Sequence, residues 1–78
     1  MVTPETLLEQ ALYLHDFGGM ASIHLQYIPY KGHWECQASW SSGKTVTCAD
    51  DYCDEAMEKL SQELERLRIG KDAKGGTP

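Results

Sequence analysis

The sequence contains no apolar run close to the roughly 18 residues that a membrane-spanning helix requires. Residues 1–5 also lack the basic start and apolar stretch of a secretory signal. From these two absences we expect a cytoplasmic protein without membrane contact. The chain has 78 residues, enough for one domain. A domain of this size buries only about 60% of the surface that its unfolded form exposes, which leaves little room for an enclosed active site.

Cysteine is scarce as well. The chain has three, Cys36, Cys48 and Cys53, and an odd number does not fit a small scaffold held together by disulfides. We therefore expect reduced, partly buried thiols. His33 and Cys36 are spaced like zinc ligands, and Cys48 with Cys53 would complete a four-ligand site. In a strand, however, His33 and Cys36 point to opposite faces, so the sequence predicts no metal site.

Catalytic groups are few. Cys53 is the candidate nucleophile, because it lies near the start of a predicted helix, where the helix dipole favours a thiolate. The acids around it, Asp51 and Asp54 among them, oppose that effect. A Cys-His reaction would also require an imidazole within hydrogen-bonding reach and a pocket for the substrate. We expect no catalytic residue, no cofactor and no enzymatic activity.

Basic residues are nearly absent from one stretch of the chain. Between Asp50 and Glu65 the only base is Lys59, although the net charge of the whole chain is only -5. Such a surface repels nucleic-acid phosphates and anionic lipids and attracts basic partners. The acids of this stretch are Asp50, Asp51, Asp54, Glu55, Glu58, Glu63 and Glu65.

The stretch WSSGKT, residues 40–45, ends like the loop that holds nucleotide phosphates. That loop needs a further glycine where this chain has Ala38, and a helix directly after its Ser or Thr. Here the next residues, 46–48, are a β-branched run that predicts a strand. We therefore predict a hairpin, in which Gly43 supplies a positive φ to the turn.

The spacing of apolar residues predicts the remaining elements. Thr3 caps a first helix of about eleven to thirteen residues, which Phe17-Gly18-Gly19 breaks. From Met20 onward the spacing between apolar residues changes from three or four positions to two, which is typical of a strand. The expected elements are then a strand over 20–28, a strand over 34–40, a strand over 44–48, and a helix from Asp50 or Asp51 to Leu67.

These elements predict an α+β fold of order α-β-β-β-α. The strands form a three-stranded antiparallel meander, and both helices pack on one face to cover its apolar side. Residues 1–69 form a single domain, and residues 70–78 form a disordered tail because they contain no large apolar residue. The side chains that face the helices from the central strand are Trp34, Cys36, Ala38 and Trp40.

This order of elements resembles the double-stranded-RNA-binding domain over about residues 4–67. The resemblance implies that the first helix and a loop histidine contact two minor grooves, and that lysines at the start of the second helix bind the phosphates between them. Residues 50–55 carry acids in place of those lysines, so we do not expect a nucleic-acid partner. The residues that carry the resemblance are Pro4, Leu8, Tyr27, Gly32, His33 and Trp34.

The acids of the second predicted helix fall on the face opposite its apolar face. That apolar face is formed by Cys53, Ala56, Met57, Leu60, Leu64 and Leu67. One interpretation is a solvated face that keeps a small domain soluble. The other is a docking surface for a basic groove on another protein. Calcium is not predicted, because the acids lie on a helix and not in a ligand-wrapping loop. The docking interpretation involves Asp51, Tyr52, Asp54, Glu55, Glu58 and Glu65.

The predicted function is that of a small acidic adaptor or inhibitor that binds a basic surface of a partner protein. Chains of this size and charge resemble accessory proteins of phages and mobile elements. We expect a monomer or a weak homodimer. The alternative is a nucleic-acid binder of the double-stranded-RNA type, which acts through the first helix and through Tyr30, Lys31 and His33.

Overall fold

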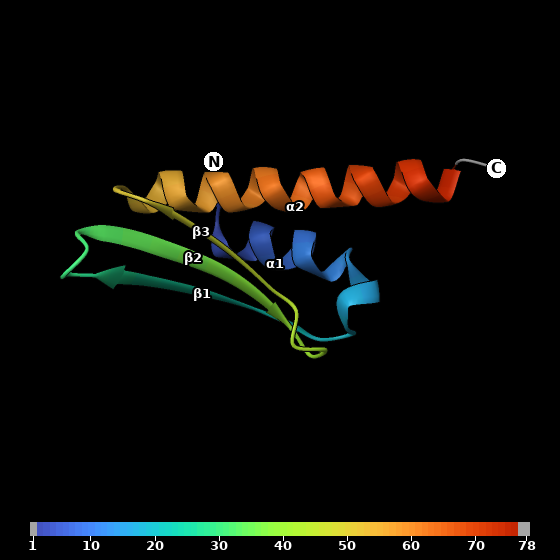
Figure 1. The fold of residues 1–78 in the computed structure, drawn as a ribbon, viewed down its shortest axis with the longest axis horizontal. Coiled ribbons are helices and arrows are strands. Elements are labelled where there is room, and N and C mark those ends of the chain that lie inside the picture. The colour runs from blue at the N-terminus through green and yellow to red at the C-terminus, as the bar shows by residue number, and fades with distance from the viewer. Residues whose placement is uncertain (1, 77–78) are drawn as a thin grey trace.

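The described part of the chain, residues 2–76, forms two helices, a short 3-10 turn and three strands (Figure 1). The computed structural model describes residues 2–76, with the side chains of all of them except residue 15 and residues 70–76. The α+β class and the order α-β-β-β-α are confirmed. The elements are α1 (Pro4–Leu12), the 3-10 turn η1 (His15–Phe17), β1 (Ala21–Ile28), β2 (His33–Trp40), β3 (Thr45–Asp50) and α2 (Cys53–Gly76).

α1 begins where the sequence predicts. The hydroxyl of Thr3 accepts a hydrogen bond from the amide of Thr6 at 3.2 Å, which satisfies one of the free donors at the helix start. Pro4 has no amide hydrogen to leave unpaired, and Glu5 places a negative charge at the positive end of the helix dipole. Local chemistry alone therefore sets this boundary.

The end of α1 differs from the prediction. The helix stops at Leu12 after nine residues, short of the expected eleven to thirteen. The carbonyl of Ala11 accepts the amide of Leu14 at 3.0 Å and also the indole N–H of Trp40 at 2.8 Å. An i to i+3 bond at this point tightens the chain out of the α-helix and into η1. The early end depends on a contact with β2, which the local sequence does not reveal.

The three strands form the predicted antiparallel meander, in the order β1-β2-β3. In its centre Cys36 of β2 pairs with Leu25 of β1 on one side and with Cys48 of β3 on the other. The hairpin predicted for residues 40–45 is confirmed. Gly43 has a φ of +96°, and its amide donates to the carbonyl of Trp40 at 2.9 Å.

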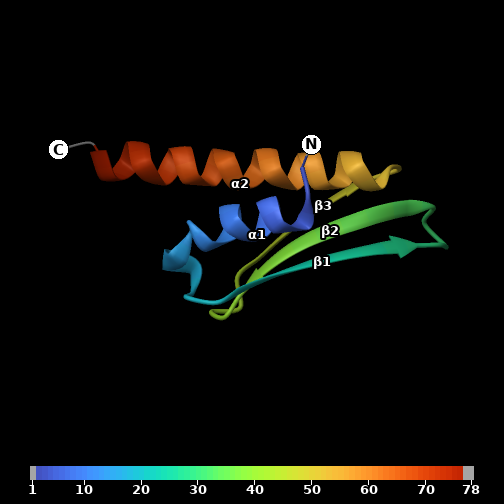
Figure 2. The same cartoon turned by 180° about the vertical axis from the view of Figure 1, so that it is seen from behind.

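Both helices lie on one face of the sheet, as Figures 1 and 2 show from opposite sides. α1 packs against β1 and α2, and α2 packs against β3 and β2. Burial of each large apolar side chain between these layers stabilises the fold by about 1.5–3 kcal/mol. The buried residues are Leu7, Ala11, Leu14, Cys36, Ala38, Trp40, Ala56, Leu60 and Leu64.

α2 is longer than its apolar face. Ala56, Leu60 and Leu64 are buried and Leu67 is half-buried against the core, as the sequence predicts. The helix then continues to Gly76, past the predicted end of the domain at residue 69. The predicted disorder of residues 70–78 stays a prediction, and its last two positions, 77 and 78, lie outside the described residues.

Candidate protein-interaction surface

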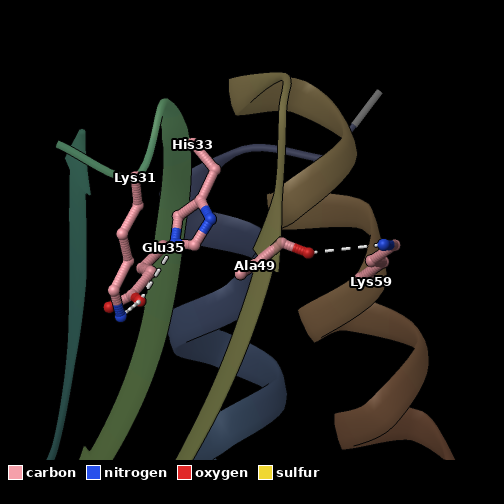
Figure 3. A network of polar contacts seen from close by, with 5 residues as sticks. All are labelled: Lys31, His33, Glu35, Ala49 and Lys59. Atoms are coloured by element: carbon pink, nitrogen blue, oxygen red, sulfur yellow. Dashed lines mark hydrogen bonds and ion pairs between the residues drawn. The ribbon is translucent and has the colours of Figure 1, made fainter. Parts of the chain in front are cut away.

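The junction between β3 and α2 is held by Asp50, the last residue of β3. The carboxylate of Asp50 lies 2.7 Å from the ammonium of Lys59 and accepts the amide of Tyr52 at 3.3 Å. Lys59 also donates to the carbonyl of Ala49 at 3.3 Å (Figure 3). The sequence assigned Asp50 or Asp51 to a helix cap and ended the strand at residue 48. In the structure β3 continues to Asp50, whose side chain connects this strand to α2.

Two carboxyl groups meet at this junction. The hydrogen bond with Lys59, followed by that with Glu55, lowers the pKa of Asp50 from its usual 3.8 to about 2. The same hydrogen bond raises the pKa of Glu55, because it favours the protonated form of Glu55 beside the Asp50 carboxylate, and the negative charge of Asp50 adds to this effect. Lys59 therefore neutralises Asp50, while the charge of Glu55 is opposed by its neighbours.

The exposed acids at the start of α2 surround this pair. Within the side chains that the structure describes, Asp51, Asp54 and Glu58 take part in no ion pair. Together with Glu55 they form what we call the acidic surface, and Tyr52 lies among them with 64% of its surface exposed. An open groove of about 410 Å³ runs beside it and is lined by Asp50, Glu55, Glu58, Lys59 and Gln62.

The acids further along α2 are paired instead. Glu63 forms an ion pair with Arg66, and Glu65 lies 3.3 Å from Arg68. Each of these pairs is one helical turn apart and cancels its own charge. The structure therefore separates Glu65 from the other predicted partner-binding residues. The spacing of three residues between each acid and its arginine is visible in the sequence, and it is the signal that distinguishes these acids from Asp54 and Glu58.

The residues predicted for nucleic-acid binding lie at the turn between β1 and β2. Tyr30 is 85% exposed, and the ammonium of Lys31 lies 5.9 Å from the centre of its ring. Sequence reasoning missed Glu35, whose carboxylate contacts His33 at 3.2 Å and Lys31 at 3.9 Å (Figure 3). Its position two residues after His33 on a strand, and so on the same face, was the available signal. Glu35 offsets the positive charge that a phosphate would need.

Cys36 and Cys48 lie on the helix-covered face of the sheet, and Cys53 is the first residue of α2. Cys36 is buried and pairs in register with Cys48, and burial followed by the charges of Cys48 and Cys53 raises the pKa of Cys36 to about 11. Burial also raises the pKa of Cys48. Among the described residues no group of three or more His, Cys, Asp or Glu side chains is placed to hold a metal ion. His33 lies on the opposite face, as its alternation with Cys36 predicts.

Comparison of the chain with protein-family models, with curated proteins and with solved structures finds no match. The candidate surface therefore rests on the geometry of its own residues. No helix in the described part of the chain combines the length and the apolar character needed to cross a membrane.

Proposed function

We propose that this protein is a non-enzymatic interaction domain, an adaptor or inhibitor that docks on a basic surface of a partner protein through the acidic surface at the start of α2. The observation that carries the proposal is the contrast within one helix. Glu63 and Glu65 are neutralised by arginines, whereas Asp54 and Glu58 are exposed and unpaired in the described structure. A face that served solubility alone would not require this segregation of charge.

The acidic surface suits a partner that brings several positive charges. Exposed charges of one sign steer a complementary partner and fix its orientation more than they add affinity. An interface also needs a well-packed anchor, and tyrosine is a common one. Tyr52 offers an exposed ring beside Asp51 and Asp54, and it immediately precedes the helix. We assign the anchor to Tyr52 and the steering to the acids around it.

The test is capture of a binding protein from source-cell lysate, with nuclease present, by three matched forms of the tagged chain. The first is the wild type, and the second carries Asp54→Lys with Glu58→Lys. The control carries Glu5→Lys with Glu9→Lys, two exposed acids on α1 with the same spacing and the same change in net charge. A partner retained by the wild type and the control and lost from the second form supports the proposal.

Equal retention by all three forms would remove the acidic surface from the mechanism. Loss from both charge-reversed forms would mean that net charge, and not this surface, drives association. Circular dichroism of each form ensures that the comparison is made between folded proteins. Because exposed charges are screened at high ionic strength, the captured partner should also dissociate as salt is raised.

A second candidate function follows from the topology, which is compatible with a double-stranded-RNA-binding domain. The observation that favours it is the exposed Tyr30, with Lys31 and His33 beside it at the β1–β2 turn. Titration with a short RNA duplex at low salt tests it directly. Binding that weakens steeply with salt and is reduced by His33→Ala would support this function, and a flat titration would exclude it.

A further inference from the structure

β1 is an edge strand whose outer side is unpaired in the described part of the chain. The amide of Ser41 donates to the carbonyl of Met20 at 2.9 Å, which sets the phase of the ladder between β1 and β2. Hydrogen-bonded and non-bonded pairs alternate in an antiparallel ladder. His24 and the other even-numbered residues of β1 therefore bond to β2. The amides and carbonyls that point to the free edge belong to Ala21, Ile23, Leu25 and Tyr27.

This edge lacks the features that usually prevent strands from pairing between molecules. Natural edge strands carry charges, prolines or bulges, or they are very short. β1 has eight residues, ASIHLQYI, without a Lys, Arg, Asp, Glu or Pro among them. Its register with β2 runs from Ala21 to Ile28 without interruption, so no bulge turns the strand away. The free backbone groups form a regular row.

The opposite edge of the sheet is protected. β3 has six residues, and Lys59 from α2 reaches across it to bond the carbonyl of Ala49 (Figure 3). Asp50 adds a charge at the end of the strand. α2, with the acidic surface at its start, packs over β3, whereas β1 forms the margin of the molecule farthest from α2 in Figures 1 and 2. The outer edge of β3 is thus partly covered by Lys59, whereas the outer edge of β1 is open in the described chain.

We propose that β1 pairs with β1 of a second copy of this chain, antiparallel about a two-fold axis at His24, so that two sheets join into one of six strands. This register lets all four free-edge residues exchange hydrogen bonds. Ile23 lies opposite the partner's Leu25, and Ala21 lies opposite the partner's Tyr27. The small side chain of Ala21 leaves room for the tyrosine ring, which is 48% exposed in the single chain.

The absence of charge on β1 permits a second copy to occupy this edge. Each chain carries a net charge of -5, so association of like chains requires a seam free of charge. β1 provides such a seam, and pairing there keeps the acidic surfaces of the two copies at opposite ends of the joined sheet. The two-fold symmetry closes the dimer, and the outer edge of β1 is covered in both copies. This inference does not depend on the proposed function, because the two surfaces do not overlap.

Amide hydrogen exchange at low and high protein concentration tests the pairing residue by residue. The amides of Ile23 and Leu25 should exchange more slowly as concentration rises, while those of Thr45 and Thr47, which point away from β2 at the outer edge of β3, should exchange at an unchanged rate. Sedimentation equilibrium should report a mass approaching twice 8.8 kDa over the same range. A monomer at all concentrations, with no change in the Ile23 and Leu25 amides, would overturn the proposal.

Two matched variants test the place of the two-fold axis. His24 and Thr47 are the two register partners of Gln37, both exposed on the open face of the sheet, one on each edge. His24→Glu places two carboxylates opposite each other at the axis, and like charges so placed should raise the dissociation constant of the dimer roughly fivefold. Thr47→Glu makes the same change in net charge and should leave it unaltered. Equal effects of the two variants would exclude β1 as the seam.

Discussion

The indole N–H of Trp40 donates a hydrogen bond of 2.8 Å to the main-chain carbonyl of Ala11, a residue 29 positions away in the sequence. The bond joins the end of β2 to the last turn of α1. The ring of Phe17 packs edge-on against the indole, with 5.1 Å between ring centres. Trp40 thus holds the helix layer, the 3-10 turn and the sheet together at one point, and it is 4% exposed.

Trp40→Phe should destabilise the fold by about 1–3 kcal/mol, because it removes this hydrogen bond and part of a buried ring. The Ala11 carbonyl keeps its bond from the Leu14 amide, so the cost stays below that of a fully unpaired buried group. The free energy of unfolding in urea measures the effect. Trp34→Phe is the control, since Trp34 is only half-buried. An equal loss in both variants would contradict the role assigned to the hydrogen bond.

Gly18→Ala should destabilise the fold by about 1–3 kcal/mol. Gly18 has a φ of +139°, and an added Cβ would lie 2.5 Å from the Ser41 hydroxyl and 3.0 Å from the amide nitrogens of Ser41 and Ser42. The adjacent Gly19 is the control, because a Cβ there meets nothing within 4 Å. Thermal unfolding of the two variants should therefore differ, with Gly19→Ala close to the wild type. Equal melting temperatures would show that the β2–β3 turn moves aside at no cost.

The pairing of Asp50 with Lys59 should make stability depend on acid pH. The folded pKa of Asp50, about 2, lies below its usual 3.8, so the contribution of the pair is complete above the usual value. It is lost as pH falls toward 2. The difference in unfolding free energy between the wild type and Lys59→Met should be largest at neutral pH and should shrink as pH falls through 2, to the part that the hydrogen bond from Lys59 to the Ala49 carbonyl contributes. Urea titrations across this window measure the difference.

A second measurement isolates the carboxylate itself. NMR titration of the Asp50 side chain should place its pKa higher in Lys59→Met than in the wild type. Lys44→Met, which removes a cation at the other end of β3, should leave the titration of Asp50 unchanged. A pKa near 2 that persists in Lys59→Met would show that Lys59 is not its cause.

The Cys36 thiol should resist alkylation in the folded protein. Burial, followed by the charges of Cys48 and Cys53, raises the pKa of the Cys36 thiol from 9.0 to about 11. The fraction of Cys36 present as thiolate at pH 8 therefore falls roughly 100-fold. Labelling with iodoacetamide should be at least that much slower than in the urea-unfolded chain, and faster as pH rises toward 11. Mass spectrometry of the labelled peptides gives the rates. Equal rates in the folded and unfolded chain would contradict the buried position of Cys36.

The order of elements was predictable because it depends on local periods. Alternation along β2 correctly identified Cys36, Ala38 and Trp40 as buried, and three- and four-residue spacing identified Leu60 and Leu64. The end of α1 was not predictable in the same way. It depends on the reach of Trp40 to Ala11, which exists only after β2 has packed under the helix.

The candidate surface was predicted in part. Its acids are exposed at the start of α2, as their spacing on the helix indicates. The pairing of Asp50 beside them was not foreseen, since Asp50 belongs to a strand and meets Lys59 only across the β3–α2 junction. The contacts of Glu35 with His33 and Lys31 were missed as well.

The sequence by itself determined which residues form helices and strands and which side of each element is apolar, because side-chain direction repeats at a fixed period along the backbone. The tertiary structure decided which charges remain free and which sheet edge stays open. Lys59 neutralises Asp50 and covers the carbonyl of Ala49, and nothing in the described chain does the same for β1. These properties depend on distances between residues that only the packed layers bring together, so no local pattern records them.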